Sequence, residues 1–329
     1  MKLGIIGAGK IVKEVLTFIK DIEEIDLVAI AATKKSETKL KEMSRTYDID
    51  KYYLDYKELI RDPEVEVVYV ALINSLHYEV MAYAIEYGKD IICEKPFASS
   101  YRESKEIFDK AFSKNLLVIE AVSHRFIPNA LAVRKEIKNI GDIKLVSFNY
   151  SQYSSRYDDF KEGIIAPVFS RKQAGGSLMD INFYNVDYLA GLFGRPKDVK
   201  YFPNIEREID TSGILYLDYG DFKAIAIGSK DTDVASVNTI QADGGSIEIR
   251  DSLSTFSSFR IKKRLDKDYR QVNLNEPCNR LFYEFKEIAK LIACRDMKRV
   301  KEYSINSLDT AWILEEARKY AGIIFPSDL

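Results

Sequence analysis

The chain has 329 residues, of which 46% are hydrophobic and 30% are charged, and its formal net charge at pH 7 is −2. This composition is typical of a globular protein, and the length exceeds the roughly 250–300 residues at which a single core stops growing, so two domains are expected. The nearly balanced charge excludes the basic excess of a nucleic-acid-binding protein, and no apolar run approaches the roughly 20 residues of a membrane span.

The cysteines and histidines are too few and too scattered for a disulfide framework or a metal site. Cys93, Cys278 and Cys294 are an odd, widely spaced set, which is typical of reduced thiols in a cytoplasmic protein. The only histidines are His77 and His124, and no Cys-x-x-Cys pair is present, so we expect no metal ion. The first apolar run breaks into glycines instead of a cleavage site, so we expect no signal peptide.

The first third of the chain alternates predicted strands with predicted helices. Short apolar runs predict strands over residues 3–6, 27–31, 65–71, 90–93 and 116–119. Helical patterns lie between them, over residues 12–19, 37–47, 56–61 after a capping Asp55, 77–87 and 100–114. This alternation indicates βαβ units and a parallel, doubly wound sheet of the Rossmann type.

The rhythm changes after about residue 120. A helix is predicted over 128–139, a strand over 144–153, a helix over 180–193, and mainly strands over 199–272 with a turn at Asp243-Gly244-Gly245. Two helices close the chain, one over 280–292 and one ending near Gly322. We expect an α/β protein with a dinucleotide-binding Rossmann domain over 1–120. Residues 121–329 would form an α+β domain, with a large, mostly antiparallel sheet, for substrate binding and oligomerisation.

A pair of glycines follows the first predicted strand and opens the first predicted helix. In Gly7-Ala8-Gly9 the first glycine would allow a tight bend, and the second would let the backbone approach a pyrophosphate at the helix N-terminus. The third glycine of the usual G-x-G-x-x-G pattern is replaced by Val12. Such turns also occur without ligands, but the surrounding βαβ pattern favours dinucleotide binding.

The end of the second predicted strand bears on the choice of cofactor. NAD enzymes usually place Asp or Glu there to bind the ribose 2′-hydroxyl. Here the strand runs into Ala32-Thr33-Lys34-Lys35-Ser36, with no acid before Glu37. A hydroxyl and two ammonium groups suit a 2′-phosphate, so the sequence favours NADP(H) over NAD(H). The alternative is a basic loop that only meets solvent.

Three further segments carry recognisable motifs. Residues 88–96 read Gly-Lys-Asp-Ile-Ile-Cys-Glu-Lys-Pro, residues 74–78 read Asn-Ser-Leu-His-Tyr, and residues 174–184 read Ala-Gly-Gly-Ser-Leu-Met-Asp-Ile-Asn-Phe-Tyr. Together they resemble the motifs of the glucose–fructose oxidoreductase, inositol dehydrogenase and rhizopine-catabolism (Gfo/Idh/MocA) family, G-K-x-V-x-x-E-K-P, N-x-x-H and G-G-G-x-L-x-D-x-G-x-H/Y. The chain departs from the family at Leu72-Ile73, where Thr-Pro is common, and at Asn182, where glycine is usual. The resemblance covers nearly the whole chain.

The resemblance implies an oxidoreductase whose catalytic residues are Lys95, Asp180 and Tyr184. Lys95 also follows a predicted parallel strand, where doubly wound sheets bind ligands, although a surface lysine would occupy the same position. Asp180 and Tyr184 are four residues apart and would share one face of the predicted helix; the alternative is a capping Asp180 and a core Tyr184. As in members that resemble dimeric dihydrodiol dehydrogenase, Tyr184 would exchange the proton, with Lys95 as its electrostatic partner.

Pattern and resemblance together assign residues to the cofactor and the substrate. The cofactor set is Gly7, Ala8, Gly9, Lys10, Ile11, Thr33, Lys34, Leu72, Asn74, His77, Glu94 and Lys95. Within it, His77 is expected to support the pocket instead of acting as acid or base. Arg125 and Arg171 are the candidates for substrate binding. For Arg125, a structural ion pair is an equal alternative.

The sequence therefore predicts reversible hydride transfer between NADP(H) and the carbonyl or hydroxyl carbon of a sugar, a polyol or a cyclic diol. One alternative is a non-catalytic dinucleotide-binding regulator on the same scaffold, which would not need Lys95, Asp180 and Tyr184. The other is a reductase of a non-sugar substrate, such as a tetrapyrrole or an imine.

A homodimer or a higher homo-oligomer is the expected assembly. Ile214-Leu215-Tyr216-Leu217 and Ala224-Ile225-Ala226-Ile227 are apolar on both alternating faces of predicted strands. A sheet that is apolar on both faces needs a partner on each, and members of the family it resembles often pair through this sheet.

Overall fold

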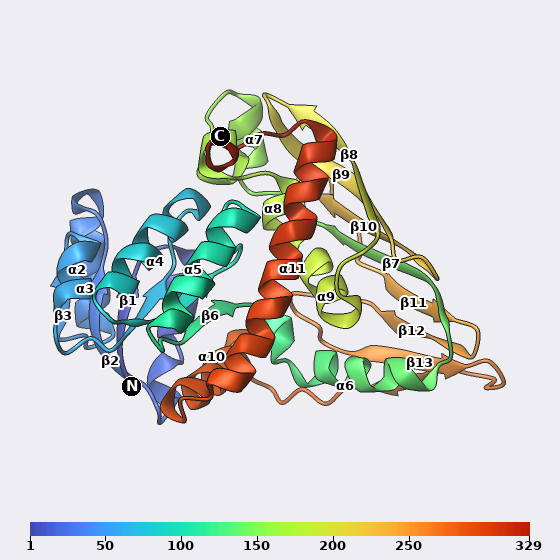
Figure 1. The fold of residues 1–329 in the computed structure, drawn as a ribbon, viewed down its shortest axis with the longest axis horizontal. Coiled ribbons are helices and arrows are strands. Elements are labelled where there is room, and N and C mark those ends of the chain that lie inside the picture. Colours follow the sequence, from blue (N-terminus) through green and yellow to red (C-terminus); the bar gives the residue numbers. More distant parts are fainter. The chain divides into compact units, whose positions relative to one another are not determined.

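The computed structural model describes residues 1–329, and the chain forms two compact units. The first unit comprises residues 1–121 and 279–307, and the second comprises residues 122–278 and 308–329. The third and last crossing between the units falls inside one helix, α11 (Met297–Ala321), which is orange to red in Figure 1. None of the helices combines the length and the apolarity of a membrane-spanning segment.

This division differs from the predicted domains in one respect. The predicted boundary after residue 120 lies next to the observed division after Ala121, but residues 279–307 belong to the first unit. The reason is the apolar face of α10 (Arg280–Ala293). Phe285 on that face contacts Tyr69 edge-on, with ring centroids 5.0 Å apart, and it also contacts Phe18. An amphipathic pattern shows that a helix face is buried, but not which of two sheets it covers.

The first unit is built on a six-stranded sheet with the strand order β3-β2-β1-β4-β5-β6. Its strands are β1 (Lys2–Ile6), β2 (Asp26–Ala31), β3 (Lys51–Tyr53), β4 (Val67–Val70), β5 (Asp90–Glu94) and β6 (Val118–Ala121). All pairings are parallel, which confirms the predicted doubly wound sheet. Strand β3 escapes sequence prediction because its residues are half-buried or exposed and form no apolar run.

The helices of the first unit begin and end close to their predicted limits. They are α1 (Lys10–Leu16), α2 (Glu37–Thr46), α3 (Tyr56–Arg61), α4 (His77–Glu86), α5 (Tyr101–Ser113), α10 and the first part of α11. Asp55 accepts a hydrogen bond from the Lys57 amide at 2.9 Å and caps α3, as predicted. Gly88, with a φ of +69°, follows the end of α4. Helices α3, α4 and α5 lie side by side (Figure 1).

The second unit is built on an eight-stranded sheet with the order β14-β13-β12-β11-β7-β10-β9-β8. Its strands are β7 (Ile143–Ser151), β8 (Asp198–Glu206), β9 (Ile209–Asp218), β10 (Lys223–Ser229), β11 (Asn238–Ala242), β12 (Gly245–Ile249), β13 (Phe259–Lys263) and β14 (Arg270–Val272). Only the pairing of β7 with β10 is parallel, which confirms the predicted, mostly antiparallel sheet. The turn predicted at Asp243-Gly244-Gly245 joins β11 to β12.

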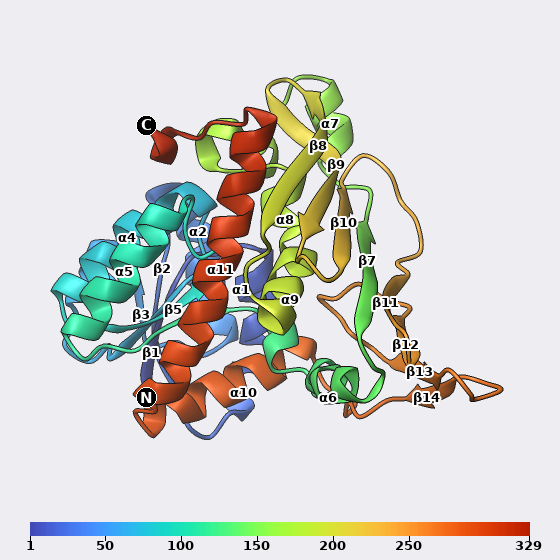
Figure 2. The same ribbon diagram turned by 45° about the vertical axis from the view of Figure 1, so that its right-hand side comes forward.

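The helices of the second unit are α6 (Pro128–Glu136), α7 (Tyr157–Lys161), α8 (Ser177–Asp180), α9 (Phe183–Phe193) and the last part of α11. Figure 2 shows α8 and α9 on the same side of the sheet, where α9 contacts β7 and β10. The prediction of one helix over 180–193 is wrong, because Asp180 ends α8 whereas Tyr184 lies in α9. The two residues therefore do not share a face of one helix.

The connection between α8 and α9 is held by Asn182. Its backbone is in the ordinary right-handed region, so this replacement of the usual glycine causes no strain. The side-chain amide donates to the carbonyl oxygen of Ala226 on β10 at 3.1 Å, and Oδ1 accepts from Asn185 at 2.8 Å. A β-carbon at Gly228 would lie 2.5 Å from Cβ of Asn182. The glycine on β10 therefore makes room for the asparagine.

Candidate active site

The glycine turn after β1 brings the chain close to the end of β4. Gly7 has a φ of +135°, which side chains rarely adopt, and a β-carbon there would overlap the carbonyl oxygen of Ala71. The Gly7 amide donates to the carbonyl oxygen of Ala31 at 2.8 Å, which fastens the turn to β2. The fold itself therefore requires glycine at position 7.

The second glycine of the turn faces open space. Gly9 is the N-cap of α1, no side chain caps this helix, and a β-carbon at Gly9 would meet no atom within 4 Å. A pyrophosphate can therefore approach the backbone there closely, as in other Rossmann turns. Ala8 and Ile11 are half-buried and Lys10 is exposed. The turn fits the dinucleotide that the sequence predicts.

The strand order puts this turn at the switch point of the sheet. β1 pairs with β2 on one side and with β4 on the other, so the chain winds away from β1 in both directions. In doubly wound sheets, ligands bind at this point, beyond the carboxyl ends of the strands. Leu72 and Asn74 follow β4, and Lys95 follows β5, so these predicted residues share one sheet edge with Gly7.

The segment after β2 carries the positive charge that a 2′-phosphate needs. Thr33 and Lys34 are exposed, and Lys34 begins a 3₁₀ turn. A residue that the sequence prediction missed adds to them. The ammonium of Lys39, on α2, donates to the carbonyl oxygen of Ala8 in the glycine turn. One ammonium group is thus placed directly at the turn.

His77 connects the segments that follow β4 and β5. Its Nδ1 lies 2.9 Å from the carbonyl oxygen of Pro96, and its Nε2 lies 3.2 Å from that of Leu72. The ring is fully buried, and burial lowers the pKa of His77, so the ring is neutral at pH 7. A buried ring between two carbonyl groups has a supporting role, not that of an acid or base.

Glu94 is the last residue of β5 and Lys95 follows it, but the two side chains have different surroundings. Glu94 accepts a hydrogen bond from the Tyr69 hydroxyl on β4 at 2.5 Å. Burial raises the pKa of Glu94, and the Tyr69 hydrogen bond and the charge of Lys95 partly offset this. One oxygen of Glu94 therefore has a partner within the sheet, and the predicted contact of Glu94 with the cofactor stays a prediction. Lys95 is half-buried just beyond the strand, where the sequence predicts it.

In the second unit, a glycine pair precedes α8. Gly176 has a φ of +105°, and a β-carbon there would overlap Oδ1 of Asp210 on β9. Oδ2 of Asp210 accepts from the Leu178 amide at 2.7 Å and from the Tyr201 hydroxyl at 2.8 Å. Burial raises the pKa of this carboxyl to about 6. Asp210, which no motif marks, therefore fastens the start of α8 to the sheet.

Asp180 lies at the other end of α8. Its side chain is 34% exposed, and Oδ2 forms an ion pair with the ammonium of Lys230, which is only 6% exposed. Lys230 follows the last residue of β10. The sequence prediction gave Asp180 either Lys95 or a substrate hydroxyl as its partner and did not include Lys230.

Tyr184 is the second residue of α9 and is half-buried. Its ring packs against Tyr150 of β7 and against His124, with ring centroids 6.1 Å away in each case. These contacts hold the ring through its apolar body. A tyrosine whose ring is held in this way can present its hydroxyl to a substrate.

One turn further along α9, the buried carboxylate of Asp187 accepts several hydrogen bonds. Nε2 of His124 lies 2.8 Å from Oδ2, Nε of Arg125 donates to the same oxygen at 3.1 Å, and the Thr310 hydroxyl donates to Oδ1 at 2.8 Å. Burial raises the pKa of Asp187, but the charge of Arg125 and the contact with His124 outweigh it and hold the pKa below its usual range. Asp187 is therefore ionised and anchors α9.

This network decides the roles of Arg125 and His124. The guanidinium of Arg125 is bound to Asp187 and the residue is 2% exposed, so the structure shows the ion pair that was the equal alternative to a substrate contact. His124 is fully buried, and burial lowers its pKa, so its neutral ring donates through Nε2 to Asp187. Its Nδ1 has no hydrogen-bond partner. Both residues support the helix that carries Tyr184.

Arg171, the other substrate candidate, lies in a 3₁₀ turn before the glycine pair. Its Nη2 is 3.7 Å from Oε2 of Glu208, and the two side chains are 42% and 76% exposed. An exposed ion pair of this kind holds its partners weakly. Arg171 is therefore accessible to a ligand, and its role in substrate binding stays a prediction.

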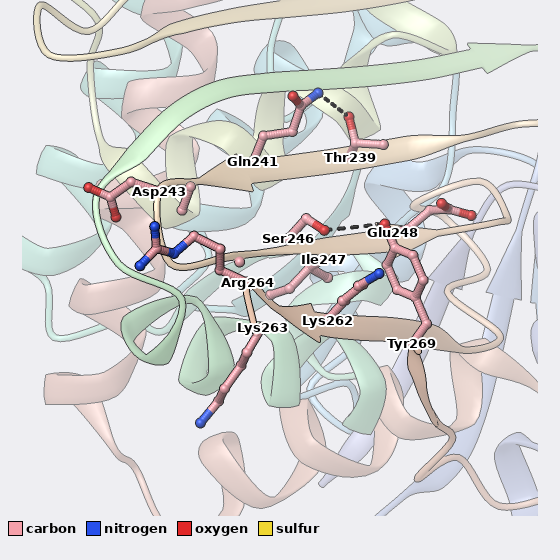
Figure 3. Close-up of a pocket in the computed structure, with 12 residues that line it drawn as sticks. Thr239, Gln241, Asp243, Ser246, Ile247, Glu248, Lys262, Lys263, Arg264 and Tyr269 are labelled. Carbon is pink, nitrogen blue, oxygen red and sulfur yellow. Dashed lines mark hydrogen bonds between the residues drawn. The ribbon is translucent and has the colours of Figure 1, made fainter. Parts of the chain in front are cut away.

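A hollow on the second sheet contains none of these residues. Its volume is about 520 Å³, and it lies over β11, β12 and β13 (Figure 3). Lys262, Lys263, Arg264 and Tyr269 line it together with polar residues of the neighbouring strands. No group of three or more His, Cys, Asp or Glu side chains is placed to hold a metal ion there or elsewhere in the chain.

The charged residues that support the site are the ones that sequence prediction missed. They are Lys39, Asp187, Asp210 and Lys230. A usable signal existed for one of them, because Asp187 is the one charged residue of a mainly apolar helix and a buried charge must find partners. The other three lie in mixed segments, where a charged residue is usually exposed.

Known proteins resemble this chain in sequence and in fold. Residues 1–122 match the Gfo/Idh/MocA model, described as an oxidoreductase family with an NAD-binding Rossmann fold. The scyllo-inositol 2-dehydrogenase (NADP(+)) IolU of Bacillus subtilis is 32% identical over 329 residues, which cover 100% of this chain and 99% of that protein. The trans-1,2-dihydrobenzene-1,2-diol dehydrogenase of Mus musculus is 27% identical, with 100% and 99% covered.

A solved structure has the same fold over nearly its whole length. KijD10, a 3-ketoreductase from Actinomadura kijaniata in complex with NADP and TDP-benzene, superposes with a TM-score of 0.84. The superposition covers 97% of each chain, at 19% sequence identity. At this identity the similarity shows the fold alone.

Proposed function

The chain belongs to the Gfo/Idh/MocA family of NAD(P)-dependent oxidoreductases, and from this premise we propose that it transfers a hydride reversibly between NADP(H) and the CH–OH carbon of a sugar, a polyol or a cyclic diol. One observation carries the proposal. The chain has the open glycine turn at Gly9 and also Lys95, Asp180 and Tyr184, each at the end or start of a regular element. A regulator that only binds a dinucleotide would need the turn alone.

The names of the relatives narrow the substrate. The relative from B. subtilis is a dehydrogenase of an inositol, and the mouse relative is a dehydrogenase of a cyclic diol. Both compounds carry hydroxyl groups on neighbouring ring carbons. We therefore place vicinal ring hydroxyls first among the candidate substrates, before open-chain sugars and non-sugar carbonyl compounds.

Within the reaction, each predicted residue has one task. The nicotinamide, when bound, supplies or accepts the hydride. Tyr184 gives a proton to the substrate oxygen, or takes it back, and Lys95 places a positive charge at that oxygen. Asp180 accepts a hydrogen bond from a substrate hydroxyl. We assign the proton transfer to Tyr184 and not to His124, because the His124 ring is fully buried.

A screen of substrates tests this function directly. NADP reduction is measured with inositols, cyclic diols and sugars, and NADPH oxidation with the corresponding ketones. We expect turnover with at least one compound that has vicinal ring hydroxyls. Tight NADPH binding without turnover of any compound, and without any effect of Lys95→Met on binding, would instead indicate the dinucleotide-binding regulator.

The choice of NADP rests on Thr33, Lys34 and Lys39. Lys39 is replaced by Met, and Lys41→Met on the same helix is the control, because Lys41 pairs with Glu37 at 2.7 Å. Loss of a charge-assisted contact should weaken NADPH binding about 10-fold in Lys39→Met. NADH binding should stay as in the wild type, and the control should bind both cofactors normally. Equal affinity of the wild type for NADPH and NADH in fluorescence titrations contradicts the assignment.

We also propose that the enzyme is a cytoplasmic homodimer. Its three cysteines are free, as in a reducing compartment. On the sheet face opposite α9, Phe202 and Ile214 are neighbours in register and are 54% and 48% exposed. Leu145, at 51%, extends this apolar surface. Light scattering at micromolar concentration should give a dimer for the wild type and a monomer for Ile214→Lys; a monomeric wild type rejects the proposal.

A further inference from the structure

Lys230 lies outside every motif that the sequence singles out, yet it touches a predicted catalytic residue. It is almost completely buried, whereas its partner Asp180 is about one-third exposed. The ammonium of Lys230 pairs with Oδ2 of Asp180. We propose that Lys230 is a positioning residue, whose buried charge keeps the Asp180 carboxylate ionised and in one orientation for the substrate. This inference rests on the proposed function and assigns a further residue to it.

The backbone of Lys230 is fixed on both sides. Its amide donates to the carbonyl oxygen of Thr211 on β9 at 2.8 Å, and its carbonyl oxygen accepts from the Ser154 amide at 2.9 Å. The ammonium also lies 5.3 Å from the centre of the Phe169 ring. A long side chain that starts from a rigid strand end and passes an aromatic face has few conformations left. The charge at Asp180 is therefore held in place by the sheet.

Other carboxyl groups near Lys230 have their own donors. Asp231, the next residue, accepts from the hydroxyls of Ser229, Thr211 and Ser212 at 2.6–2.8 Å. Asp210 on β9 has its amide and hydroxyl donors, and the charge of Lys230 only moderates the rise of its pKa. The one direct ion pair of the ammonium is the pair with Asp180. The lysine is thus directed at the predicted catalytic carboxylate.

The short helix α8 makes this contact necessary. It has only four residues, Ser177–Asp180, and so short a helix has almost no stability of its own. Asp210 fastens its start through the Leu178 amide, and Lys230 fastens its end through the Asp180 carboxylate. Without Lys230, the Asp180 carboxylate would lose a charged partner that is fixed to the sheet and would be held less firmly for the substrate. Because the ion pair of Lys230 is with Asp180 and not with a predicted cofactor residue, turnover should suffer and NADPH binding should not.

A double-mutant cycle tests the proposal with the substrate found in the screen. The proteins are wild type, Lys230→Met, Asp180→Asn and the double variant, with Lys223→Met on β10 as the control, because Lys223 pairs with Asp218 and not with Asp180. Lys230→Met should lower kcat about 10- to 100-fold in the wild-type background. In the Asp180→Asn background it should cause almost no further loss. NADPH affinity should not change in any of them.

Two further readouts separate positioning from mere structural support. Lys230→Arg, which keeps the charge, should recover a large part of the lost kcat. In Lys230→Met the acidic limb of the kcat/KM profile should move to higher pH, because a carboxylate without a positive neighbour is protonated more easily. Lys230→Gln is measured in parallel, so that the result does not depend on the folding of one variant.

The possible results distinguish failure of the proposed function from failure of the inference on Lys230. If Asp180→Asn is as active as the wild type, the assignment of Asp180 in the proposed function fails. If Asp180→Asn is impaired but Lys230→Met is not, only the inference on Lys230 fails. Equal losses from Lys230→Met in both backgrounds, or loss of the folded state in both Lys230→Met and Lys230→Gln, would assign Lys230 to stability and overturn the inference.

Discussion

Asp187 and Asp210 are both fully buried carboxyl groups of the second unit, yet their pKa values move in opposite directions. Burial raises both, but Arg125 and His124 at Asp187 outweigh burial and lower its pKa. The hydrogen bonds to Asp210 come from an amide and a hydroxyl, which are neutral, and its pKa rises to about 6. The charge of the partners therefore decides whether a buried carboxyl stays ionised.

The difference bears on the site because each carboxyl anchors a different helix. Asp187 belongs to α9, which carries Tyr184, and Asp210 fastens the start of α8, which carries Asp180. The support of Tyr184 is thus an ion pair that does not change near neutral pH. The support of Asp180 contains a group that titrates near pH 6. The catalytic assignments and the two supports can be tested separately.

The largest effect on turnover is expected when the Tyr184 hydroxyl is removed and the anchoring of α9 by Asp187 is kept. Tyr184→Phe deletes only the hydroxyl, so the packing on Tyr150 and His124 remains. Turnover should fall on the order of 10²–10⁴-fold, which is the usual contribution of general acid–base catalysis. The free energy of unfolding should change by less than about 1 kcal/mol. Steady-state kinetics and urea unfolding of the same preparation measure both quantities.

A different pattern would move the proton to another residue. If Tyr184→Phe keeps most of its activity while His124→Asn loses it, His124 exchanges the proton, despite its contact with Asp187. That result would also mean that residues 174–184, which contain Tyr184, align differently with the motif of the family.

The converse experiment removes the Asp187 carboxylate, which anchors α9, and keeps the Tyr184 hydroxyl. Asp187→Asn takes away the carboxylate that faces the buried Arg125 guanidinium, and breaking a buried pair costs about 3–5 kcal/mol of stability. Asp309→Asn is the control, because Asp309 pairs with the half-exposed Arg195 at 2.6 Å and should cost less than about 1 kcal/mol. Urea unfolding at pH 7 measures both. Similar costs for the two variants would show that Asp187 is no stronger an anchor than a surface pair.

The two supports also show how far the sequence predicts this protein. The strands of the first unit, except β3, follow from short apolar runs, and Lys95 follows from its position after one of them. The gap between α8 and α9 could not be predicted, because Asp180 and Tyr184 also fit the spacing of one continuous helix. The gap depends on Asn182, Gly228 and Ala226, which meet only in the folded chain.

Buried charges mark a second limit of sequence prediction. Lys230 stands next to Asp231 at a strand end and reads as a surface residue, but it is 5% exposed. Arg125 follows a histidine at the predicted domain boundary, where a substrate contact and an ion pair were equal alternatives. Its partner Asp187 is 62 residues away in the chain. A pairing over that distance leaves no periodic pattern in one sequence.

The smallest predicted effect concerns Asp210 and depends on pH. The pKa of Asp210 is about 6 in the folded protein, and in the unfolded chain it takes the ordinary value of 3.8. Between these values the unfolded chain releases the proton while the folded protein keeps it, so stability falls as the pH rises through this range. In Asp210→Asn the side chain cannot ionise, so the variant does not lose this stability as the pH rises. The variant should therefore gain up to about 3 kcal/mol over the wild type between pH 4 and pH 7, at about 1.4 kcal/mol for each pKa unit.

The sign of this change separates Asp210 from an ordinary carboxylate of the same sheet. Hydroxyl hydrogen bonds lower the pKa of the neighbouring Asp231 in spite of its partial burial. Asp231→Asn should therefore lose stability relative to the wild type as the pH rises toward 3.8, the ordinary value, and its difference from the wild type should stay nearly constant between pH 4.5 and 7.5. Groups common to all three proteins cancel in the differences between urea-unfolding free energies at pH 4.5 and 7.5. If the difference for Asp210→Asn is the same at both pH values, the carboxyl is already ionised at pH 4.5. In that case the support of α8 is as independent of pH as that of α9.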